Sequence, residues 1–366
     1  MKPIKVLALT KYGCQGASSR LRTFQYLPSL ARAKVEVSVQ SLLSDELLQA
    51  RYRRGRYGIS LLSAYGQRFR ELMGRRQFDL LWIEKEALPW WPLWLERSLL
   101  SGVPYVLDYD DALFHNYDLH RSALVREVFG QRLDGLMRKA SLVVGGNQYL
   151  AQRALDAGAP WVEVIPTVID LERYTTTPTR TLDSQALTLV WIGSPSTVRY
   201  LRELSKPLAN LARSVEFTLR VIGAQLELPD VRVECVPWTE ATEVAAIAEC
   251  DIGLMPLLDT PWERGKCGYK LIQYMACALP VVASPVGANR EIVREGVSGF
   301  LAESPQQWVD ALGTLLTDAQ LRSAMGREGR KRVEASYCVQ NTGPRMAELL
   351  LSASGIGTAC LNSLPC

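Results

Sequence analysis

The 366-residue sequence is poor in the residues from which metal sites are built. It contains only two histidines, and its eight cysteines form no C-x-x-C pair. We therefore expect no zinc cluster and no bound metal. The amino terminus carries no recognisable secretory signal, so the cysteines are interpreted as reduced core residues of a cytoplasmic protein.

Long apolar runs and a strong charge of either sign are also missing. No segment approaches the roughly 20 apolar residues of a membrane span. A net charge of +4 does not imply a general affinity for nucleic acid, so no nucleic-acid partner is expected. The length exceeds what one hydrophobic core usually covers, and we therefore predict two domains.

The turn after the first predicted strand, residues 12–19, lacks the G-x-G-x-x-G spacing of a dinucleotide fingerprint. A helix is predicted to begin at Arg20, with Ser18 or Ser19 as its N-cap. Gly16 and Arg20 are predicted to lie near a phosphate group of a bound ligand. The alternative for Arg20 is a solvated side chain at the start of a helix.

Three acids gather at the end of a predicted buried strand that runs from Val103 to Leu107. Asp108, Asp110 and Asp111 should lie together there, and they would repel one another unless a cation or sugar hydroxyls engage them. We therefore predict a functional site at this strand end.

Two further polar residues are predicted to contact a bound ligand. Glu86 lies in the exit turn of the preceding strand, and His115 follows the acids on a polar stretch that also contains His120. The alternative for the two histidines is that both are ordinary surface residues.

Arginine is concentrated between residues 51 and 76, and tryptophan between residues 90 and 94. The residues are Arg51, Arg53, Arg54, Arg56, Arg68, Arg70, Arg75, Arg76, Trp90, Trp91 and Trp94. Basic side chains with interfacial aromatic rings suit a protein that lies on an anionic membrane surface. We predict such a peripheral contact, on the inner face of the plasma membrane, through Arg51–Arg76 and Trp90–Trp94. The alternatives are a solvated helix face and ordinary core packing.

The second half of the chain begins after a polar, aperiodic stretch at residues 171–185, which is typical of an interdomain linker. A predicted strand follows and ends in a turn that starts with Gly193 and Ser194. Small residues ahead of a helix, with Arg199 nearby, make a cradle for phosphate. The alternative is that this turn only caps the helix.

The stretch from Glu263 to Leu301 is the most informative part of the chain. We predict a helix after Gly268, a short apolar strand at residues 281–283 and a second helix after Gly287. Two glycine-rich turns thus open two helices at the carboxyl edge of a parallel sheet, where helix amino termini and free amides attract phosphate. A site for an anionic ligand is predicted at this edge.

The same stretch resembles the donor-binding segment of the family-4 retaining glycosyltransferases, which have the two-domain GT-B fold. The matching residues are Gly268, Tyr274-Met275-Ala276, Pro280-Val281-Val282, Gly287 to Glu291 and Gly296 to Leu301. Near the amino terminus, "S-R-x-R-x-x-Q-Y-L-P-x-L" is similar to the opening of a bacterial surface-polysaccharide subset of that family.

The chain departs from the family pattern at two acids. Gln273 stands where the family has the acid that holds the donor ribose, and an amide can still hydrogen-bond a hydroxyl. Glu263 is displaced from the position of the other acid, which in the family touches the donor sugar. The predicted donor-binding set is Gly16, Gly193, Ser194, Arg199, Glu263, Lys266, Gly268, Gln273 and Gly287.

The resemblance implies transfer of a sugar from a nucleotide-sugar donor to a hydroxyl of a saccharide or lipid-linked acceptor, without a cofactor, in surface polysaccharide or lipopolysaccharide synthesis. Lys270, with Lys266, would neutralise the pyrophosphate. Asp110 or Asp111 would orient the acceptor hydroxyl or assist its deprotonation, at a strand end where the family commonly has a histidine. Arg20, Glu86 and His115 would bind the acceptor.

Asp108-x-Asp110 also spells the D-x-D that holds manganese in the other large glycosyltransferase fold, GT-A. That fold has no second Rossmann-like half, which this chain is predicted to contain. Two other functions stay open as alternatives, namely a non-catalytic GT-B binding or scaffold protein and a sugar-nucleotide epimerase. An epimerase needs no acceptor surface, so the arginine and tryptophan region disfavours it.

The predicted fold class is α/β, a GT-B arrangement of two Rossmann-like parallel-sheet domains facing a central cleft, with a C-terminal helix that crosses back to the first domain. The predicted parts are an acceptor-binding domain at 1–170, a linker at 171–185, a nucleotide-sugar-binding domain at 186–335, the crossing helix at 336–352 and a flexible tail at 353–366.

Overall fold

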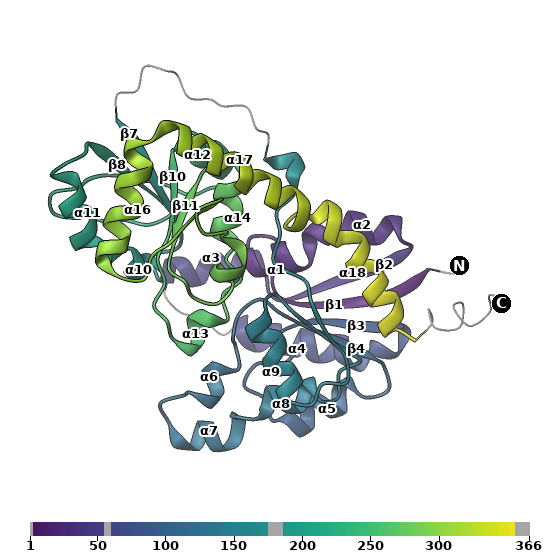
Figure 1. The fold of residues 1–366 in the computed structure, drawn as a ribbon. Coiled ribbons are helices and arrows are strands. Elements are labelled where there is room, and N and C mark those ends of the chain that lie inside the picture. Colours follow the sequence, from purple (N-terminus) through teal and green to yellow (C-terminus); the bar gives the residue numbers. More distant parts are fainter. Residues whose placement is uncertain (1–2, 55–59, 175–185, 356–366) are drawn as a thin grey trace. The chain divides into compact units, whose positions relative to one another are not determined.

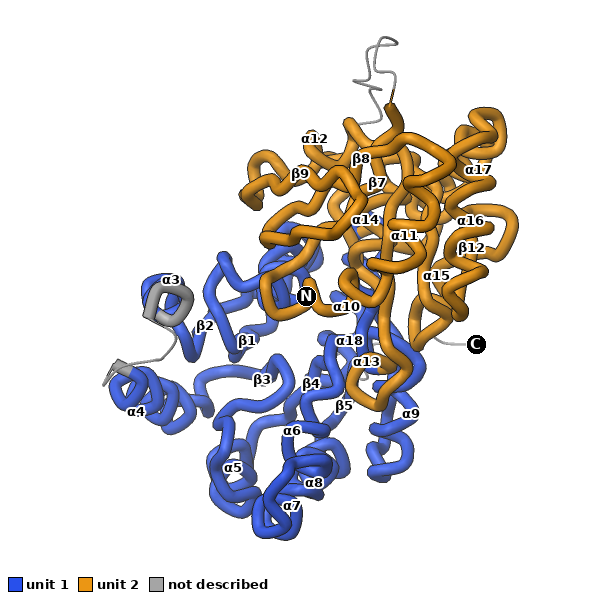
Figure 2. Tube along the Cα trace, turned by 90° about the vertical axis from the view of Figure 1, so that its left-hand side faces the viewer, with its two compact units in different colours: residues 1–167, 265–267, 339–366 blue, residues 168–264, 268–338 orange. Residues whose placement is uncertain are grey.

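Two compact units make up the chain in a computed structural model, which describes residues 3–54, 60–174 and 186–355 (Figure 1). Unit 1 contains Met1–Thr167, Gly265–Cys267 and Val339–Cys366, and unit 2 contains Val168–Arg264 and Gly268–Cys338 (Figure 2). The boundaries expected from the sequence remain predictions. The tail from residue 356 and most of the predicted linker, residues 175–185, lie outside the described residues.

Unit 1 is built on a parallel sheet of six strands in the order β2-β1-β3-β4-β5-β6. Its strands are β1 (Ile4–Tyr12), β2 (Val35–Leu43), β3 (Leu80–Glu84), β4 (Tyr105–Tyr109), β5 (Leu142–Gly145) and β6 (Val162–Val164). The central strands are apolar along their whole length because helices cover both faces of a parallel sheet. Within this sheet Glu84 pairs with Asp108, which places the ends of β3 and β4 side by side.

The helices of unit 1 alternate with these strands. They are α1 (Ala17–Arg22), η1 (Phe24–Tyr26), α2 (Leu27–Arg32), α3 (Asp45–Arg54), α4 (Ser60–Met73), η2 (Arg75–Gln77), α5 (Leu93–Leu100), α6 (His115–Asp118), α7 (Ala123–Phe129), α8 (Arg132–Met137), α9 (Gln148–Asp156) and α18 (Val339–Ala353). The last of them, α18, packs on α2, and the hydroxyls of Tyr26 and Thr342 lie 3.0 Å apart.

The starts of two helices in unit 1 differ in their caps. Asn147 caps α9, because its side chain accepts a hydrogen bond from the Leu150 amide at 2.9 Å. The N-cap predicted at Ser18 or Ser19 is wrong, since Gly16 is the N-cap of α1 and both serines lie inside the helix.

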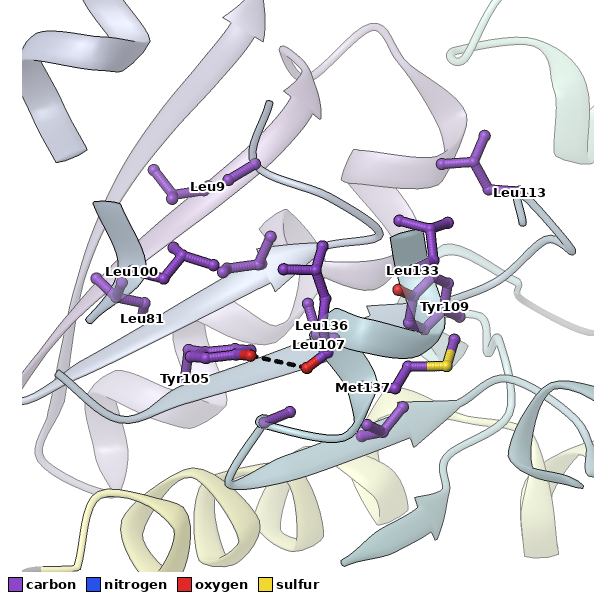
Figure 3. Close-up of a cluster of buried hydrophobic side chains, with 14 of the residues drawn as sticks. Leu9, Leu81, Leu100, Tyr105, Leu107, Tyr109, Leu113, Leu133, Leu136 and Met137 are labelled. Carbon is purple, nitrogen blue, oxygen red and sulfur yellow. Dashed lines mark hydrogen bonds between the residues drawn. The ribbon is translucent and has the colours of Figure 1, made fainter. Parts of the chain in front are cut away.

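The core of unit 1 lies under β3 and β4, where α8 packs against the sheet (Figure 3). Leu107, Leu133 and Leu136 are buried there, and Tyr105 keeps its hydroxyl satisfied by donating to the Leu136 carbonyl at 2.7 Å. A rigid sheet core of this kind holds the strand ends at fixed positions.

Unit 2 repeats the architecture with the strand order β12-β11-β10-β7-β8-β9, again parallel throughout. Its strands are β7 (Leu187–Ile192), β8 (Phe217–Ile222), β9 (Arg232–Val236), β10 (Ile252–Met255), β11 (Val281–Ala283) and β12 (Gly299–Leu301). Its helices are η3 (Leu171–Arg173), α10 (Val198–Arg202), α11 (Ser205–Ala212), α12 (Glu243–Ala248), α13 (Pro261–Arg264), α14 (Tyr269–Ala276), α15 (Asn289–Ile292), α16 (Pro305–Thr317) and α17 (Ala319–Ser336).

The α/β class and the two parallel sheets predicted from the sequence are confirmed. In the part of the chain that the structure describes, no helix combines the length and apolarity needed to cross a bilayer.

Candidate functional site

The carboxyl ends of β1, β3 and β4 bring four acids together in unit 1, and we call Glu84, Asp108, Asp110 and Asp111 the acid cluster. Parallel neighbouring strands end at one edge of the sheet, so residues after each end meet there. Glu84 is the last residue of β3, Asp108 belongs to β4, and Asp110 and Asp111 directly follow β4.

Asp108 lies in the interior and is matched by a guanidinium. Arg22 donates to Asp108 Oδ1 from Nε at 2.9 Å and from Nη2 at 2.6 Å, and its Nη1 donates to the Ile165 carbonyl. Burial raises the pKa of Asp108 to about 6, against the attraction of Arg22. Asp108 is therefore a structural anchor that ties α1 to β4, with no oxygen turned to solvent.

Asp110 is held by an ammonium and a hydroxyl. Lys85 Nζ lies 2.7 Å from Asp110 Oδ1 and 2.8 Å from Ser18 Oγ, and the Ser18 hydroxyl donates to Asp110 Oδ2. Burial acts to raise the pKa of Asp110, but the Lys85 ion pair and the two hydrogen bonds outweigh it and lower the pKa below its ordinary value. Asp110 is thus ionised and fixed in place.

Asp111 is the most accessible member of the cluster, with 35% of its side chain exposed. Its nearest cation is Lys266, whose Nζ lies 3.9 Å from Asp111 Oδ1. Burial and then repulsion by Asp110 raise the pKa of Asp111. Of the two acids predicted to act on an acceptor, Asp111 is the one with room to contact a ligand.

Glu84 ties the first turn of the chain to this edge. The Ser19 hydroxyl donates to Glu84 Oε2 at 2.5 Å, and the Lys11 amide donates to the same oxygen at 3.1 Å. Gly16 precedes α1 in close contact with the Tyr12 side chain, which an added Cβ would strike at 2.2 Å. The solvated alternative for Arg20 is wrong, because Arg20 is buried and its guanidinium donates to the Cys14 carbonyl at 3.4 Å.

The two other predicted acceptor contacts lie in hydrogen-bond networks of their own. Glu86 is buried and accepts hydrogen bonds from Arg132 and from the Tyr117 hydroxyl, the latter at 2.9 Å. His115 is half-buried, and its ring nitrogens lie 2.8 Å from Asp118 Oδ1 and 2.8 Å from the Tyr149 hydroxyl. The side chains of Glu86 and His115 bond to these partners, and neither is hydrogen-bonded to a side chain of the acid cluster.

The acids are poorly suited to hold manganese in the D-x-D manner. Arg22 engages Asp108 and Lys85 engages Asp110, so cations of the protein already occupy the places of metal. Among the described residues, no three or more histidine, cysteine, aspartate or glutamate side chains are grouped to hold a metal ion.

In unit 2 the predicted donor residues lie around the carboxyl ends of β7 and β10. Gly193 and Ser194 form the turn after β7, which is closed by a bond from the Ser194 amide to Thr197 Oγ1 at 3.1 Å. Arg199 follows on α10 and is well exposed, with its Nη2 3.4 Å from Glu263 Oε1. An exposed guanidinium next to this turn can form an ion pair with a bound anion.

Glu263 is buried, and its carboxylate accepts hydrogen bonds from the Tyr200 and Thr260 hydroxyls. These bonds connect α13 to α10 and give Glu263 a positioning role for Arg199. Gln273 is also buried, and its amide nitrogen donates to the Tyr174 hydroxyl at 3.0 Å. Both residues that depart from the family acids are therefore engaged inside unit 2.

Gly268 opens α14 with a φ of 65°, and an added Cβ there would meet Ile292 Cδ1 at 2.2 Å. Lys270 lies in the first turn of this helix, with Nζ 5.8 Å from the centre of the Trp191 ring. Gly287 has a φ of 50°, and a Cβ there would strike the Arg264 carbonyl oxygen at 2.5 Å. Both turns thus require glycine. Together they hold the amino terminus of α14 and Lys270 at the carboxyl edge of the unit-2 sheet.

The two lysines predicted to share a pyrophosphate belong to different units. Lys266 lies in the short segment Gly265–Cys267 of unit 1, where its carbonyl accepts a hydrogen bond from Asn147 Nδ2 at 3.0 Å. Cys267 Sγ donates to the Asp110 carbonyl at 3.1 Å in the same unit. Lys270 belongs to unit 2.

Lys85 and Ser18 are functional candidates that the sequence did not single out as ligand-binding. Nothing in the order "E-K-E" distinguishes Lys85 from a surface lysine. The signal is the backbone, since Lys85 has a φ of 66° and such a conformation is uncommon for a side-chain-bearing residue.

The arginine and tryptophan region is only partly exposed. Arg68 and Arg75 are buried and donate to backbone carbonyls, Arg68 to Thr10 at 2.7 Å and Arg75 to Ser101 at 2.9 Å. For these two residues the predicted membrane contact is wrong, because each guanidinium satisfies carbonyl groups inside unit 1. The side chains of Arg51 to Arg56 lie outside the described residues.

The comparisons with known proteins agree with this architecture. Residues 186–318 match the family model described as Glycosyl transferases group 1. Those residues therefore resemble a glycosyltransferase group 1 domain. D-inositol 3-phosphate glycosyltransferase of Pseudarthrobacter chlorophenolicus is 30% identical over 131 residues, which are 35% of this chain and 30% of that protein. In three such curated relatives the match spans between 20% and 35% of the relative's own length.

Two solved glycosyltransferase structures share the fold of most of the chain. Anabaena HepE, in a complex with UDP and glucose, has a TM-score of 0.72 at 19% identity and covers 95% of this chain and 100% of its own. Sucrose-phosphate synthase from Thermosynechococcus elongatus has a TM-score of 0.70 at 15% identity, over 95% of this chain and 98% of its own. At these identities the likeness concerns the fold, which is GT-B.

Proposed function

We propose that this protein is a glycosyltransferase that moves a sugar from a nucleotide-sugar donor to a hydroxyl of a saccharide or lipid-linked acceptor. The observation that carries the proposal is the unit-2 edge, where Gly268 opens α14 with Lys270 in its first turn, inside the domain that matches the group 1 family. A helix start with a lysine stabilises a diphosphate as it departs, and this step needs no protein nucleophile.

The donor would bind in unit 2 with its diphosphate against the α14 start, the turn at Gly193 and Ser194, and the Arg199 guanidinium. In unit 1 the acid cluster offers carboxylates, which are the acceptors that sugar hydroxyls prefer. Asp111 is proposed to hydrogen-bond the acceptor hydroxyl, and the departing phosphate can take up its proton.

The donor site is tested by thermal unfolding of the protein with UDP-, GDP-, dTDP- and CMP-sugars. One nucleotide class is expected to raise the melting temperature, and Lys270→Ala is expected to abolish that rise because the diphosphate loses its lysine. Lys331→Ala, on an exposed lysine of α17, serves as the matched control and should keep the full shift. A well-folded protein that responds to none of these sugars contradicts the proposal.

A binding protein without catalysis is the second candidate, favoured by the internal bonds of Gln273 and Glu263. Such a protein would bind the donor but leave it intact. The release of UDP from UDP-glucose, followed over hours against a buffer blank, separates the two functions. Release that depends on Lys270 supports the transferase.

We also propose that transfer retains the anomeric configuration, uses no metal and serves bacterial surface polysaccharide synthesis. The support is the motif resemblance in the second half, together with the ion pairs that occupy the aspartate oxygens. Product anomers assigned by NMR coupling constants would test retention. Activity that persists in excess EDTA would test the metal-independent route.

Contact with an anionic membrane surface is proposed through the tryptophan segment of unit 1. Trp94 is 71% exposed and Trp90 is 50% exposed, and the Trp90 ring lies 6.0 Å from that of Phe129 at the end of α7. Exposed indoles favour the bilayer interface. Cosedimentation with phosphatidylglycerol vesicles is expected to fall in Trp94→Ala, whereas the buried arginines make no contribution.

A further inference from the structure

The turn after β3 holds a lysine in a strained backbone conformation. Lys85 has a φ of 66°, and the Glu86 amide donates to the Glu84 carbonyl at 2.7 Å across it. A three-residue turn with positive φ at its centre is rare and strained, and glycine or asparagine would adopt it more readily. Strained residues held by their surroundings concentrate at functional sites.

The strain directs the Lys85 side chain into the acid cluster. Its Nζ donates to Ser18 Oγ at 2.8 Å and forms ion pairs with Asp110 Oδ1 at 2.7 Å and Glu84 Oε1 at 3.8 Å, so three groups of the site surround the ammonium. The side chain is only 6% exposed, which leaves no room for a substrate phosphate on this lysine. Lys85 therefore acts on other residues of the cluster.

Lys85 divides the two adjacent aspartates into different roles. It closes a triangle with Asp110 and Ser18, in which Asp110 is immobile and charged. Asp111 lies outside this triangle, and 35% of its side chain is exposed. Two neighbouring carboxylates in unlike surroundings are a common way to separate a fixed charge from a group that handles protons.

We propose that Lys85 is a positioning residue that locks Asp110 into a fixed ion pair and thereby leaves Asp111 as the carboxylate that binds the acceptor hydroxyl. This rests on the proposed transferase function, and it identifies which of the two acids meets the acceptor. The charged, titratable and hydrogen-bonding groups around the pair are Lys11, Ser18, Arg22, Glu84, Lys85, Asp108, Lys266 and Cys267.

Removing the Lys85 charge has a predictable sign. Both aspartates lose a nearby cation, so the pair takes up its first proton at a higher pH. Because protonation of the pair sets the acidic limb of the pH–activity profile, this limb should also move to higher pH. If Asp110 is also made neutral, Asp111 loses the repulsion by Asp110 as well as the attraction of Lys85. The acidic limb of the pH–activity profile should then return towards that of the unchanged protein.

The test measures UDP release from UDP-glucose, with water as the acceptor, across pH in Lys85→Met, Lys85→Arg, Asp111→Asn and the double variant Lys85→Met/Asp110→Asn. Lys85→Met is expected to slow release at least about tenfold at neutral pH and to shift the limb upwards, with KM for UDP-glucose unchanged. Lys85→Arg should keep the limb, and Asp111→Asn should abolish it.

Lys34→Met is the matched control. Lys34 is also a lysine with positive φ, 61°, but it is exposed at the start of β2 and lies at the opposite end of the strands. Its loss should leave rate and limb unchanged. A uniform fall in rate for Lys85→Met without any shift of the limb would indicate a merely structural lysine and would overturn the proposal.

A second measurement decides the case if the protein proves not to release UDP. Aspartate labelled with ¹³C at the carboxyl carbon reports the titration of the pair directly, with Asp110→Asn and Asp111→Asn to assign the signals. An upper titration midpoint that rises in Lys85→Met supports the Lys85 role, and an unchanged midpoint overturns it. Failure of every nucleotide sugar to bind would instead count against the transferase function.

Discussion

At the scale of single residues, the pair of Arg22 and Asp108 carries the largest expected effect on stability. Both side chains are 1% exposed. Replacing Arg22 with methionine leaves a buried carboxylate without its cation, so Arg22→Met is expected to lower the free energy of unfolding by about 3 to 5 kcal/mol in urea titrations.

The control for this prediction is the double variant Arg22→Met/Asp108→Leu. It removes both charges from the interior and should recover most of the lost stability, since an apolar pair of similar volume is often neutral there. Arg70→Met, on an exposed arginine of α4, should change stability by less than about 0.5 kcal/mol. A loss for Arg22→Met no larger than that of Arg70→Met would refute the assignment.

Glu96 predicts a dependence of stability on pH. Glu86 and Glu96 share one cation, Arg132, and burial raises the pKa of Glu96 from 4.5 to about 7. The folded state therefore binds a proton that the unfolded state has released between these two values. Stability contributed by this proton is full below pH 4.5 and is lost as the pH rises to about 7.

Glu96→Gln removes this titrating group. Between pH 5 and pH 8, the free energy of unfolding of the variant should change by about 1 to 3 kcal/mol less than that of the unchanged protein. Urea titrations at the two pH values measure the difference. The same fall in stability with rising pH in both proteins would place the titrating group elsewhere.

Sequence patterns located charged residues better than they located their partners. Asp108, Asp110 and Asp111 could be placed at a strand end because three acids follow an apolar run. Their cations come from other elements, Arg22 from helix α1 and Lys85 from the turn after β3, and their proximity depends on sheet order and on a positive φ. Neither property has a signature in a single sequence.

At the scale of elements, the start of α14 depends on a glycine for two separate reasons. Gly268 has a positive φ, and a Cβ would also clash with Ile292. Gly296 has a similar φ, 71°, but open space around it. Gly296→Ala should cost about 1 to 2 kcal/mol from the backbone alone, and Gly268→Ala should cost more.

Chemical unfolding of the two alanine variants compares these costs directly. Gly268→Ala is also expected to weaken nucleotide-sugar binding, because the clash displaces the first turn of the helix. Equal losses of stability in both variants would mean that the Ile292 side chain moves away from the added Cβ without cost. The close contact would then contribute nothing to the requirement for glycine at residue 268.

Strands were more predictable than helices. The short apolar run at residues 281–283 has the bounds predicted for it, because burial on both faces leaves a clear pattern. The first helical region was predicted as one helix from Arg20. It is instead divided into α1, η1 and α2, with a break at Thr23. Such a break arises from packing and leaves no periodic signal.

At the scale of the whole molecule, α18 completes unit 1 from the far end of the sequence. It packs on α2, and a Cβ at Gly343 would meet Ser29 Oγ at 2.5 Å. Truncation after Cys338 should therefore uncover apolar surface on α2. We expect the truncated protein to aggregate or to unfold in two separate steps, as followed by size-exclusion chromatography and calorimetry.

A control truncation after Gly355 removes only residues outside the described part of the chain and should behave like the full protein. A monomeric truncation at Cys338 with one unchanged transition would contradict the role given to α18. The two-unit organisation itself could be expected from length and from repeated strand and helix patterns, but the assignment of α18 to unit 1 came from family resemblance.

The three residues Gly265–Cys267 belong to unit 1 although their neighbours on both sides belong to unit 2. The chain consequently passes from one unit to the other at four places, after residues 167, 264, 267 and 338. No single crossover in a gene can exchange one unit intact. A recombinant that took its second half from a relative would import a tripeptide that must fit the Asp110 carbonyl and Asn147 of its new host. Substitutions in residues 265–267 are therefore expected to be inherited together with substitutions around Asp110 and Asn147.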